Sequence, residues 1–178
     1  MVIVLTVICT LVSALLAGVY ALTNDLYESN VLFAKQSAIA ALYGHEQVET
    51  EALPAGGEVE ELYRVSLDGQ LLGYCVNVKS AGFGGNIDMM VAADADGRLL
   101  GVRIVSMSET PGVGSRVEDE AHLGQYRGLD VQDDVVLGKQ VDAVSSATIS
   151  SKAVNEGVRR ALGEIRALFG AQEEGSPE

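Results

Sequence analysis

The chain has 178 residues, enough for one domain of ordinary size and one additional element. It carries 25 Asp and Glu residues against 12 Lys and Arg, a formal net charge of −13, which argues against nucleic acid and anionic lipid surfaces as partners. Only two histidines are present, and the two cysteines, Cys9 and Cys75, lie far apart, so the sequence predicts neither a zinc site nor an iron–sulfur cluster.

The N-terminal stretch, residues 1–22, contains no charged residue. As a helix it spans roughly 30 Å, the thickness of the hydrocarbon core of a bilayer, so we expect a single transmembrane anchor that contacts lipid. A cleaved signal peptide is the alternative, because Val19 and Ala21 could occupy the positions before a cut, but the segment has no basic start and is long for a leader. Asp25 and Glu28 follow the anchor and are consistent with an extracytoplasmic domain.

Residues 23–58 are predicted to connect the anchor to a folded domain. Thr23 or Asn24 can cap a second helical stretch, which continues the anchor as a stalk, and Gly44 is a typical helix end. Residues 45–58 are polar and contain one proline and two glycines, which indicates a linker.

Two consecutive β-hairpins are predicted to begin the folded domain, which we expect over residues 59–170. Asp68-Gly69 and Asp96-Gly97 each lie between runs of β-forming residues, as in a tight turn, and together they predict an antiparallel sheet. The six residues that start at Asp68 recur with one change 28 positions later, which indicates either a duplicated unit or the general likeness of Asp-Gly hairpins. The strands are expected at residues 61–67, 71–79, 86–94 and 98–106.

Two glycine-rich loops accompany these hairpins. The first, Gly82-Phe83-Gly84-Gly85, joins the two hairpins, and the second, Glu109-Thr110-Pro111-Gly112-Val113-Gly114, follows the second hairpin. Glycine adopts backbone conformations that other residues resist, and it lets the backbone approach a flat ligand closely. From the residues alone, each loop is either a simple connection or part of a binding site.

The C-terminal part is predicted to end in an amphipathic helix and an acidic tail. Apolar residues at helical spacing place the helix from about Ser151 to Phe169, and Gly170 is expected to end it. Residues 171–178 are expected to be disordered. His122 is interpreted as a surface or internally hydrogen-bonded histidine. Before the final helix we expect a short helix near Glu118–Tyr126 and a strand near Asp134–Leu137.

The segment directly before the final helix is rich in hydroxyl groups. Ser145, Ser146, Thr148, Ser150 and Ser151 fall within seven positions. The N–H groups of a first helical turn have no intrahelical acceptor, and the helix dipole favours an anion there, so the segment is either a phosphate site or a capped helix start. The chain has no Gly-x-Ser-x-Gly elbow, no P-loop and no local triad signature, so no catalytic residue is predicted.

Three motifs of this chain resemble those of the covalent FMN-binding domain family. The segment from Asp142 to Thr148 resembles its flavinylation motif, which reads Asp, two variable residues, Ser or Thr, usually Gly, and then Ala-Thr. The loops Glu109–Gly114 and Gly82–Gly85 resemble its Glu-Thr-Pro-Gly and Gly-aromatic-Gly signatures, and the motifs occur in the family's order. Ser146 departs from the pattern, because glycine is usual there.

The resemblance implies a covalent FMN whose phosphate is esterified to the hydroxyl of Thr148 by a dedicated flavin transferase. The neighbouring hydroxyls and Lys152 would surround the phosphate, and the two glycine loops would border the isoalloxazine ring. The residues that the resemblance assigns to the cofactor are Asp142, Ser145, Ser146, Ala147, Thr148, Ser151, Lys152, Glu109, Thr110, Pro111, Gly112, Val113, Gly114, Gly82, Phe83, Gly84 and Gly85.

Within that family, the short chain and single anchor resemble the G subunit of the Rnf ferredoxin:NAD electron-transport complex, a relative of the C subunit of the sodium-pumping NADH:quinone reductase. This resemblance implies an α+β fold with one transmembrane helix, antiparallel β-hairpins and a C-terminal helix. It also implies a redox protein in the cell (inner) membrane, with the FMN domain extracytoplasmic, that joins other membrane and redox subunits in moving Na⁺ or H⁺. The alternatives are a non-redox module that binds a ligand or partner, and a flavin reductase outside any such complex.

Overall fold

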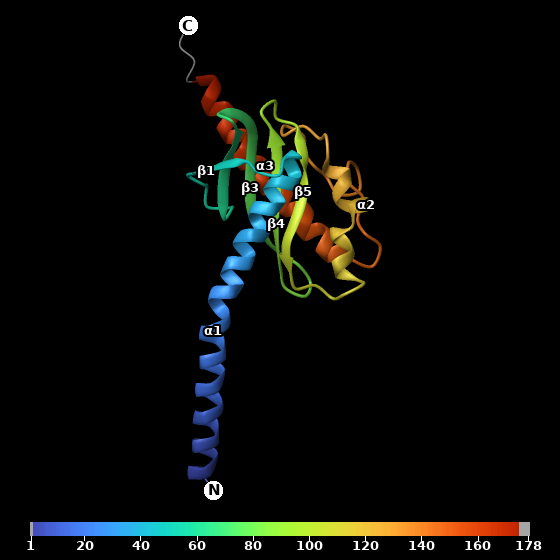
Figure 1. The fold of residues 1–178 in the computed structure, drawn as a ribbon. Helices are drawn as coiled ribbons and strands as arrows, with labels where there is room; N and C mark the ends of the chain where they lie inside the picture. Colours follow the sequence, from blue (N-terminus) through green and yellow to red (C-terminus); the bar gives the residue numbers. More distant parts are fainter. Residues whose placement is uncertain (1, 175–178) are drawn as a thin grey trace. The chain divides into compact units, whose positions relative to one another are not determined.

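A computed structural model describes residues 2–174 of the chain (Figure 1). The chain separates into two compact units, Met1–Ala34 and Lys35–Glu178. The second unit contains the β-sheet, the C-terminal helix and the segments that join them. It contains the predicted folded domain, residues 59–170, and also the residues from 35 to 58 that were expected to form the end of the stalk and the linker.

Helix α1 (Val2–Tyr43) is one continuous helix. Its apolar part, Val2–Tyr20, is suited by length and composition to cross a membrane, and none of it is buried. The expected cap near Thr23 is wrong, because no glycine or proline interrupts the chain between Gly18 and Gly44 and the helix continues through it. The helix ends where expected, at Gly44, whose φ of +72° a glycine adopts without strain.

Five antiparallel strands form one sheet in the order β1-β2-β3-β4-β5, which confirms the predicted antiparallel sheet. The four predicted strands match β2 to β5 to within two residues at either end. The strands are β1 (Glu49–Leu53), β2 (Glu61–Leu67), β3 (Gln70–Ala81), β4 (Asn86–Asp94) and β5 (Leu99–Met107).

Strand β1 lies inside the segment expected to be a linker, residues 45–58, so that expectation is wrong. β1 is an edge strand, and its first four residues are exposed. Its pairing with β2 runs through the backbone, with Thr50 opposite Val65, and only its last residue, Leu53, packs against the main apolar core. A polar edge strand lacks the alternation by which strands are recognised in a sequence.

The sequence repeat corresponds to a repeated backbone feature. Gly73 and Gly101 end the two copies, and each has a φ of +154° next to a register shift in its hairpin. A Cβ at Gly73 would collide with the carbonyl oxygen of Ala93 on the neighbouring strand. The repeated Asp-Gly-x-Leu-Leu-Gly sequence therefore encodes a turn followed by a β-bulge, which bends the strand in both hairpins.

Helix α3 (Thr148–Glu174) is longer than predicted at both ends. It begins three residues before Ser151 and continues through Gly170, so the predicted boundaries there are wrong. A single glycine costs a helix only about 1 kcal/mol, and the good helix formers around Gly170 offset it. Residues 171–174, expected in a disordered tail, are helical, and the rest of that tail lies outside the described residues.

Two helices cover the two faces of the sheet within the second unit. α3 packs on one face, where Leu162 joins Val91 of β4 in the main apolar core. The last turns of α1 cover the other face, where Ile39 packs in a second cluster with Met90 of β4. Alternate residues of β4 thus enter opposite cores, and the loops at the strand ends remain free to form a site.

The connection between β5 and α3 is mostly irregular. The expected strand at Asp134–Leu137 is wrong, because Leu137 forms only an isolated bridge with Val141. Gly138, with a φ of +85°, turns the chain there, and its N–H donates to the carbonyl of Val141 at 2.7 Å. The expected short helix at Glu118–Tyr126 is present as two short pieces, α2 (Glu120–Leu123) and η2 (Gly124–Tyr126). A further short helix, η1 (Gly114–Glu118), ends where the expected helix begins.

Candidate functional site

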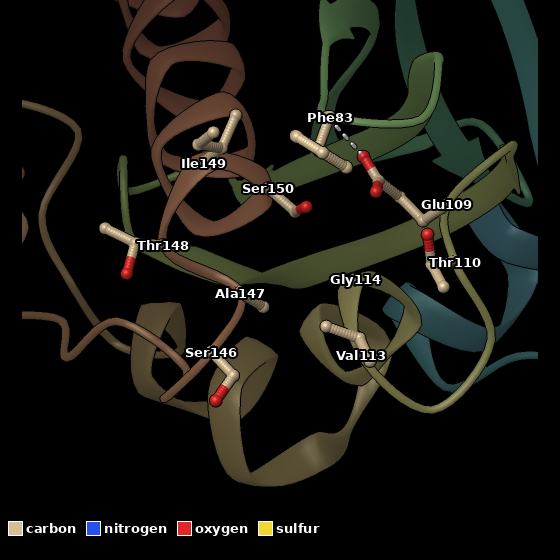
Figure 2. A pocket seen from close by; sticks show the side chains of 10 residues that line it. All are labelled: Phe83, Glu109, Thr110, Val113, Gly114, Ser146, Ala147, Thr148, Ile149 and Ser150. Atoms are coloured by element: carbon tan, nitrogen blue, oxygen red, sulfur yellow. Dashed lines mark hydrogen bonds between the residues drawn. The ribbon is translucent and has the colours of Figure 1, made fainter.

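A pocket of about 430 Å³ lies beside the start of α3 (Figure 2). Its size is in the range of small-molecule sites. Three segments far apart in the sequence line it: the first glycine loop, the second glycine loop and the hydroxyl-rich segment. The structure therefore brings residues of all three predicted motifs into one place. The lining residues are Phe83, Glu109, Thr110, Val113, Gly114, Ser146, Ala147, Thr148, Ile149 and Ser150.

The first turn of α3 provides unpaired N–H groups beside this pocket. The Ser151 N–H donates to the Ala147 carbonyl at 2.8 Å, which is the first hydrogen bond of the helix. Thr148, Ile149 and Ser150 come before that bond, and within residues 2–174 their N–H groups have no acceptor. Thr148 is exposed at the helix start. Such a helix N-terminus favours an anion through its free donors and its dipole.

A short turn holds the hydroxyl-rich segment against the helix. The Val144 carbonyl accepts the Ala147 N–H at 3.0 Å, and the Val144 N–H donates to the Ser151 hydroxyl oxygen at 3.0 Å. Ser151 is fully buried. Its hydroxyl therefore shapes the turn from inside, whereas the sequence suggested a donor to a bound phosphate.

Ser146 has a backbone conformation that favours glycine. Its φ is +71°, in the left-handed region, and Asp68 is the only other non-glycine residue with a positive φ among the described residues. The side chain of Ser146 is exposed at the edge of the pocket. The positive φ gives a backbone reason for the glycine that is usual at this position in the resembled motif.

Glu109 joins the two glycine loops. Its Oε1 accepts the Phe83 N–H at 2.7 Å (Figure 2). Its Oε2 accepts the Gly84 N–H at 3.2 Å. A Cβ at Gly82 or at Gly114 would collide with the carboxylate, so both glycines are needed to make room for it. The loops therefore have a structural reason for their glycines besides any approach to a ligand.

Phe83 and Ile149 stand out as exposed apolar side chains at this site, with 71% and 54% of their surfaces accessible. Figure 2 shows the Phe83 ring and the Ser150 hydroxyl facing the space between the helix start and Glu109. Ile149 was absent from the predicted site residues. Its position directly after Thr148, in the first turn of a helix, was the signal that could have identified it.

Several predicted site residues do not line the pocket. Gly82, Gly84 and Gly85 support the first loop next to Ser108 and Glu109. Pro111 and Gly112 are exposed in the second loop, where the Gly112 N–H donates to Ser115 at 2.9 Å. The other predicted residues outside the pocket lining are Asp142, Ser145 and Lys152, which are exposed, and the buried Ser151.

The main chain of Asp142 is fixed by two side chains from the preceding helical turns. His122 Nδ1 lies 3.1 Å from the Asp142 carbonyl, and the Gln125 Oε1 accepts the Asp142 N–H at 2.7 Å. His122 is buried, its Nε2 has no partner among the described residues, and burial lowers its pKa. Of the two alternatives predicted for His122, a surface histidine or an internally hydrogen-bonded one, the structure shows the second: it is an internal histidine that positions the start of the hydroxyl-rich segment.

Comparisons with known proteins agree with this geometry. The FMN-binding domain family matches residues 82–163, a range that contains all three motif segments. The G subunit of the proton-translocating ferredoxin:NAD(+) oxidoreductase complex of Clostridium ljungdahlii is 27% identical over 173 residues, which cover 94% of this chain and 91% of that protein. The G subunit of the ion-translocating oxidoreductase complex of Methanosarcina acetivorans is 31% identical, with 93% of each chain covered. Its counterpart in Stutzerimonas stutzeri is 30% identical, with 85% and 75% covered.

Two solved structures share the fold. NqrC of Shewanella oneidensis has a TM-score of 0.54 and 26% identity over 74% of this chain and 70% of that chain. The C subunit of the Na(+)-translocating NADH-quinone reductase from Parabacteroides distasonis has a TM-score of 0.64 and covers 85% of this chain and 97% of its own. The second is only 16% identical, so its likeness concerns the fold alone.

Proposed function

The chain belongs to the family of G subunits of ion-translocating oxidoreductase complexes, and we propose that it carries electrons within such a complex through an FMN attached to Thr148. The complex would couple electron transfer between ferredoxin and NAD to the movement of Na⁺ or H⁺. The observation that carries the proposal is the pocket itself, in which segments around Phe83, Glu109 and Thr148 meet beside a helix start with free N–H groups.

These residues fit a flavin mononucleotide at both of its ends. The exposed Thr148 hydroxyl would carry the phosphate as an ester, where the free N–H groups of the first turn and the helix dipole stabilise its charge. Phe83, Val113 and Ile149 would provide apolar contacts for the ring. The flavin supplies the redox chemistry when bound, and the chain binds and orients it. A covalent tether keeps the cofactor from dissociating.

We further propose that residues 1–22 anchor the chain in the cell membrane by a single pass, with the FMN domain outside the cytoplasm. The apolar stretch Val2–Tyr20 supports the anchor. A flavin transferase would attach the FMN, because the pocket offers the Thr148 hydroxyl but no catalytic base. Glu109 is the only ionisable residue among those that line the pocket, and its carboxylate already accepts hydrogen bonds from two backbone N–H groups. The remaining membrane and redox subunits would exchange electrons with it.

The proposal is tested by coexpressing the full chain with a flavin transferase and measuring the intact mass of the purified protein. The expected mass increase is that of one FMN less one water, and the band should fluoresce under ultraviolet light in a denaturing gel. Thr148→Ala is expected to abolish both signals. Thr110→Ala removes another exposed threonine of the same pocket and is expected to keep both, so it is the matched control.

A colourless wild-type protein of unmodified mass would contradict the proposal and would favour a non-redox binding module. An adduct that survives Thr148→Ala would contradict the attachment site. Thr148→Ser, which keeps a hydroxyl, is expected to restore at least part of the fluorescence lost in the alanine variant.

A further inference from the structure

We propose that Glu109 lowers the reduction potential of the bound flavin, because it holds a negative charge without an ion-pair partner in the wall of the pocket. The inference rests on the proposed function, because it concerns the cofactor of that function. It assigns to Glu109 a role in setting the energy of electron transfer, in addition to its contacts with the glycine loops.

The position of the Glu109 carboxylate is determined by its surroundings. Each oxygen accepts one backbone N–H, from Phe83 at 2.7 Å and from Gly84 at 3.2 Å. Gly82 and Gly114 leave the space that the carboxylate fills, and a Cβ at either position would collide with it. The two hydrogen bonds and the close approach of the chain at Gly82 and Gly114 thus hold the carboxylate in one orientation.

Within residues 2–174, this carboxylate forms no ion pair with a Lys, Arg or His side chain. Glu109 is the only ionisable residue among the ten that line the pocket. The ion pairs within the described part of the chain involve other carboxylates, those of Glu51, Glu60, Glu61 and Glu120. Glu109 is 9% exposed, so solvent screens its charge less than it screens a surface carboxylate.

A fixed negative charge opposes reduction of a neighbouring flavin. The oxidised ring is uncharged, whereas a ring that has taken up two electrons and one proton carries one negative charge. Repulsion between that charge and the carboxylate disfavours the reduced state, whichever protein of the complex supplies the electrons. Removing the charge of Glu109 is therefore expected to raise the reduced-to-oxidised ratio at a fixed ambient potential by about tenfold.

The test is a redox titration of the purified full chain, after its intact mass has confirmed the flavin adduct. Glu109→Gln keeps the size of the side chain and removes the charge, so its potential is expected to rise. Glu109→Asp keeps the charge and shortens the reach, so its potential is expected to stay near that of the wild type. Glu118→Gln removes an exposed carboxylate outside the pocket and is expected to change nothing.

Thr110→Lys gives a second, independent measurement if Glu109→Gln does not fold. It adds a positive charge at an exposed position of the same pocket, leaves the two N–H bonds of Glu109 in place, and is expected to raise the potential as well.

Four results would overturn the inference. An unchanged potential in Glu109→Gln would show that the charge does not act on the ring. Equal rises in Glu109→Gln and Glu109→Asp would assign the effect to loop position. An equal rise in Glu118→Gln would make the effect unspecific. Where Glu109→Gln does not fold, an unchanged potential in Thr110→Lys would also overturn it. A wild-type protein without the flavin adduct contradicts the proposed function itself, and the mass measurement separates that failure from the others.

Discussion

Replacing Ser146 by glycine is expected to stabilise the protein. Ser146 has a φ of +71°, a conformation that places the Cβ of an L-residue close to its own backbone. Its hydroxyl makes no hydrogen bond within residues 2–174, and its side chain is exposed, so little is lost when the side chain is removed. The substitution therefore changes mainly the strain of one residue at the edge of the pocket.

The size of the effect follows from two opposing contributions. A non-glycine residue in the left-handed region costs about 1–2 kcal/mol, which Ser146→Gly removes. Glycine also increases the conformational entropy of the unfolded chain, which costs about 0.4–1 kcal/mol. The expected net gain in the free energy of unfolding is about 0.5–1 kcal/mol, equivalent to a rise in Tm of up to roughly 4 °C for a domain of this size.

The assay is urea unfolding of the full chain in detergent, followed by circular dichroism. Ser145→Gly is the matched control, because Ser145 is the adjacent serine, is also exposed, and has no positive φ. It is expected to lower the free energy of unfolding by about 0.4–1 kcal/mol. Equal effects of the two substitutions, or a loss of stability in Ser146→Gly, would refute the assignment of strain to this residue.

Two further predictions concern the support of the pocket. Gly114→Ala is expected to lower the free energy of urea unfolding by about 1–3 kcal/mol, because the added Cβ collides with Glu109, whereas Gly57→Ala, which meets nothing within 4 Å, should change it by less than about 0.5 kcal/mol. Equal losses of unfolding free energy in the two variants would contradict the collision with Glu109. Burial lowers the pKa of His122, so the unfolded chain binds more protons at this imidazole and stability should fall as pH drops through about 6.5. Urea unfolding measured between about pH 7 and pH 5 should show a flatter dependence of stability on pH for His122→Gln than for the wild type. An equally steep dependence would contradict the role of burial.

Local turn chemistry made most of the sheet predictable from the sequence. Asp68 and Gly69 both have a positive φ, 50° and 77°, as a two-residue hairpin turn requires. Asp96-Gly97 turns the second hairpin with a positive φ at the glycine. Because each turn fixes the pairing of its two strands, four strand positions followed from two dipeptides.

Features that depend on distant partners were not predictable. β1 is stabilised as a strand by its neighbour β2, and its first three residues, Glu49 to Glu51, are polar, so the sequence there resembles a linker. The start of α3 was expected three residues late, because Thr148, Ile149 and Ser150 looked like part of a hydroxyl-rich turn. Their inclusion in the helix follows from the hydrogen bond between the Ser151 N–H and the Ala147 carbonyl, which no periodicity reveals.

The candidate site, like the sheet, was only partly predictable from the sequence. Its motifs were recognised by resemblance to a family, whereas composition and spacing supported only an anion site and two glycine loops. The bond between Glu109 and Phe83 joins residues 26 positions apart, so the reason for glycine at Gly82 and Gly114 became visible only in the fold. Ser146, a departure from the family pattern, is explained by a backbone angle that the sequence does not display.

Peptide mapping of the flavin-loaded protein tests the proposed attachment most directly. Trypsin is expected to release residues 140–152 as one fragment, between Lys139 and Lys152, and this fragment contains all five hydroxyl residues of the segment. Tandem mass spectrometry should place one FMN on Thr148. An FMN on one of the four serines, or a fragment without FMN from protein coexpressed with the transferase, would contradict attachment through Thr148.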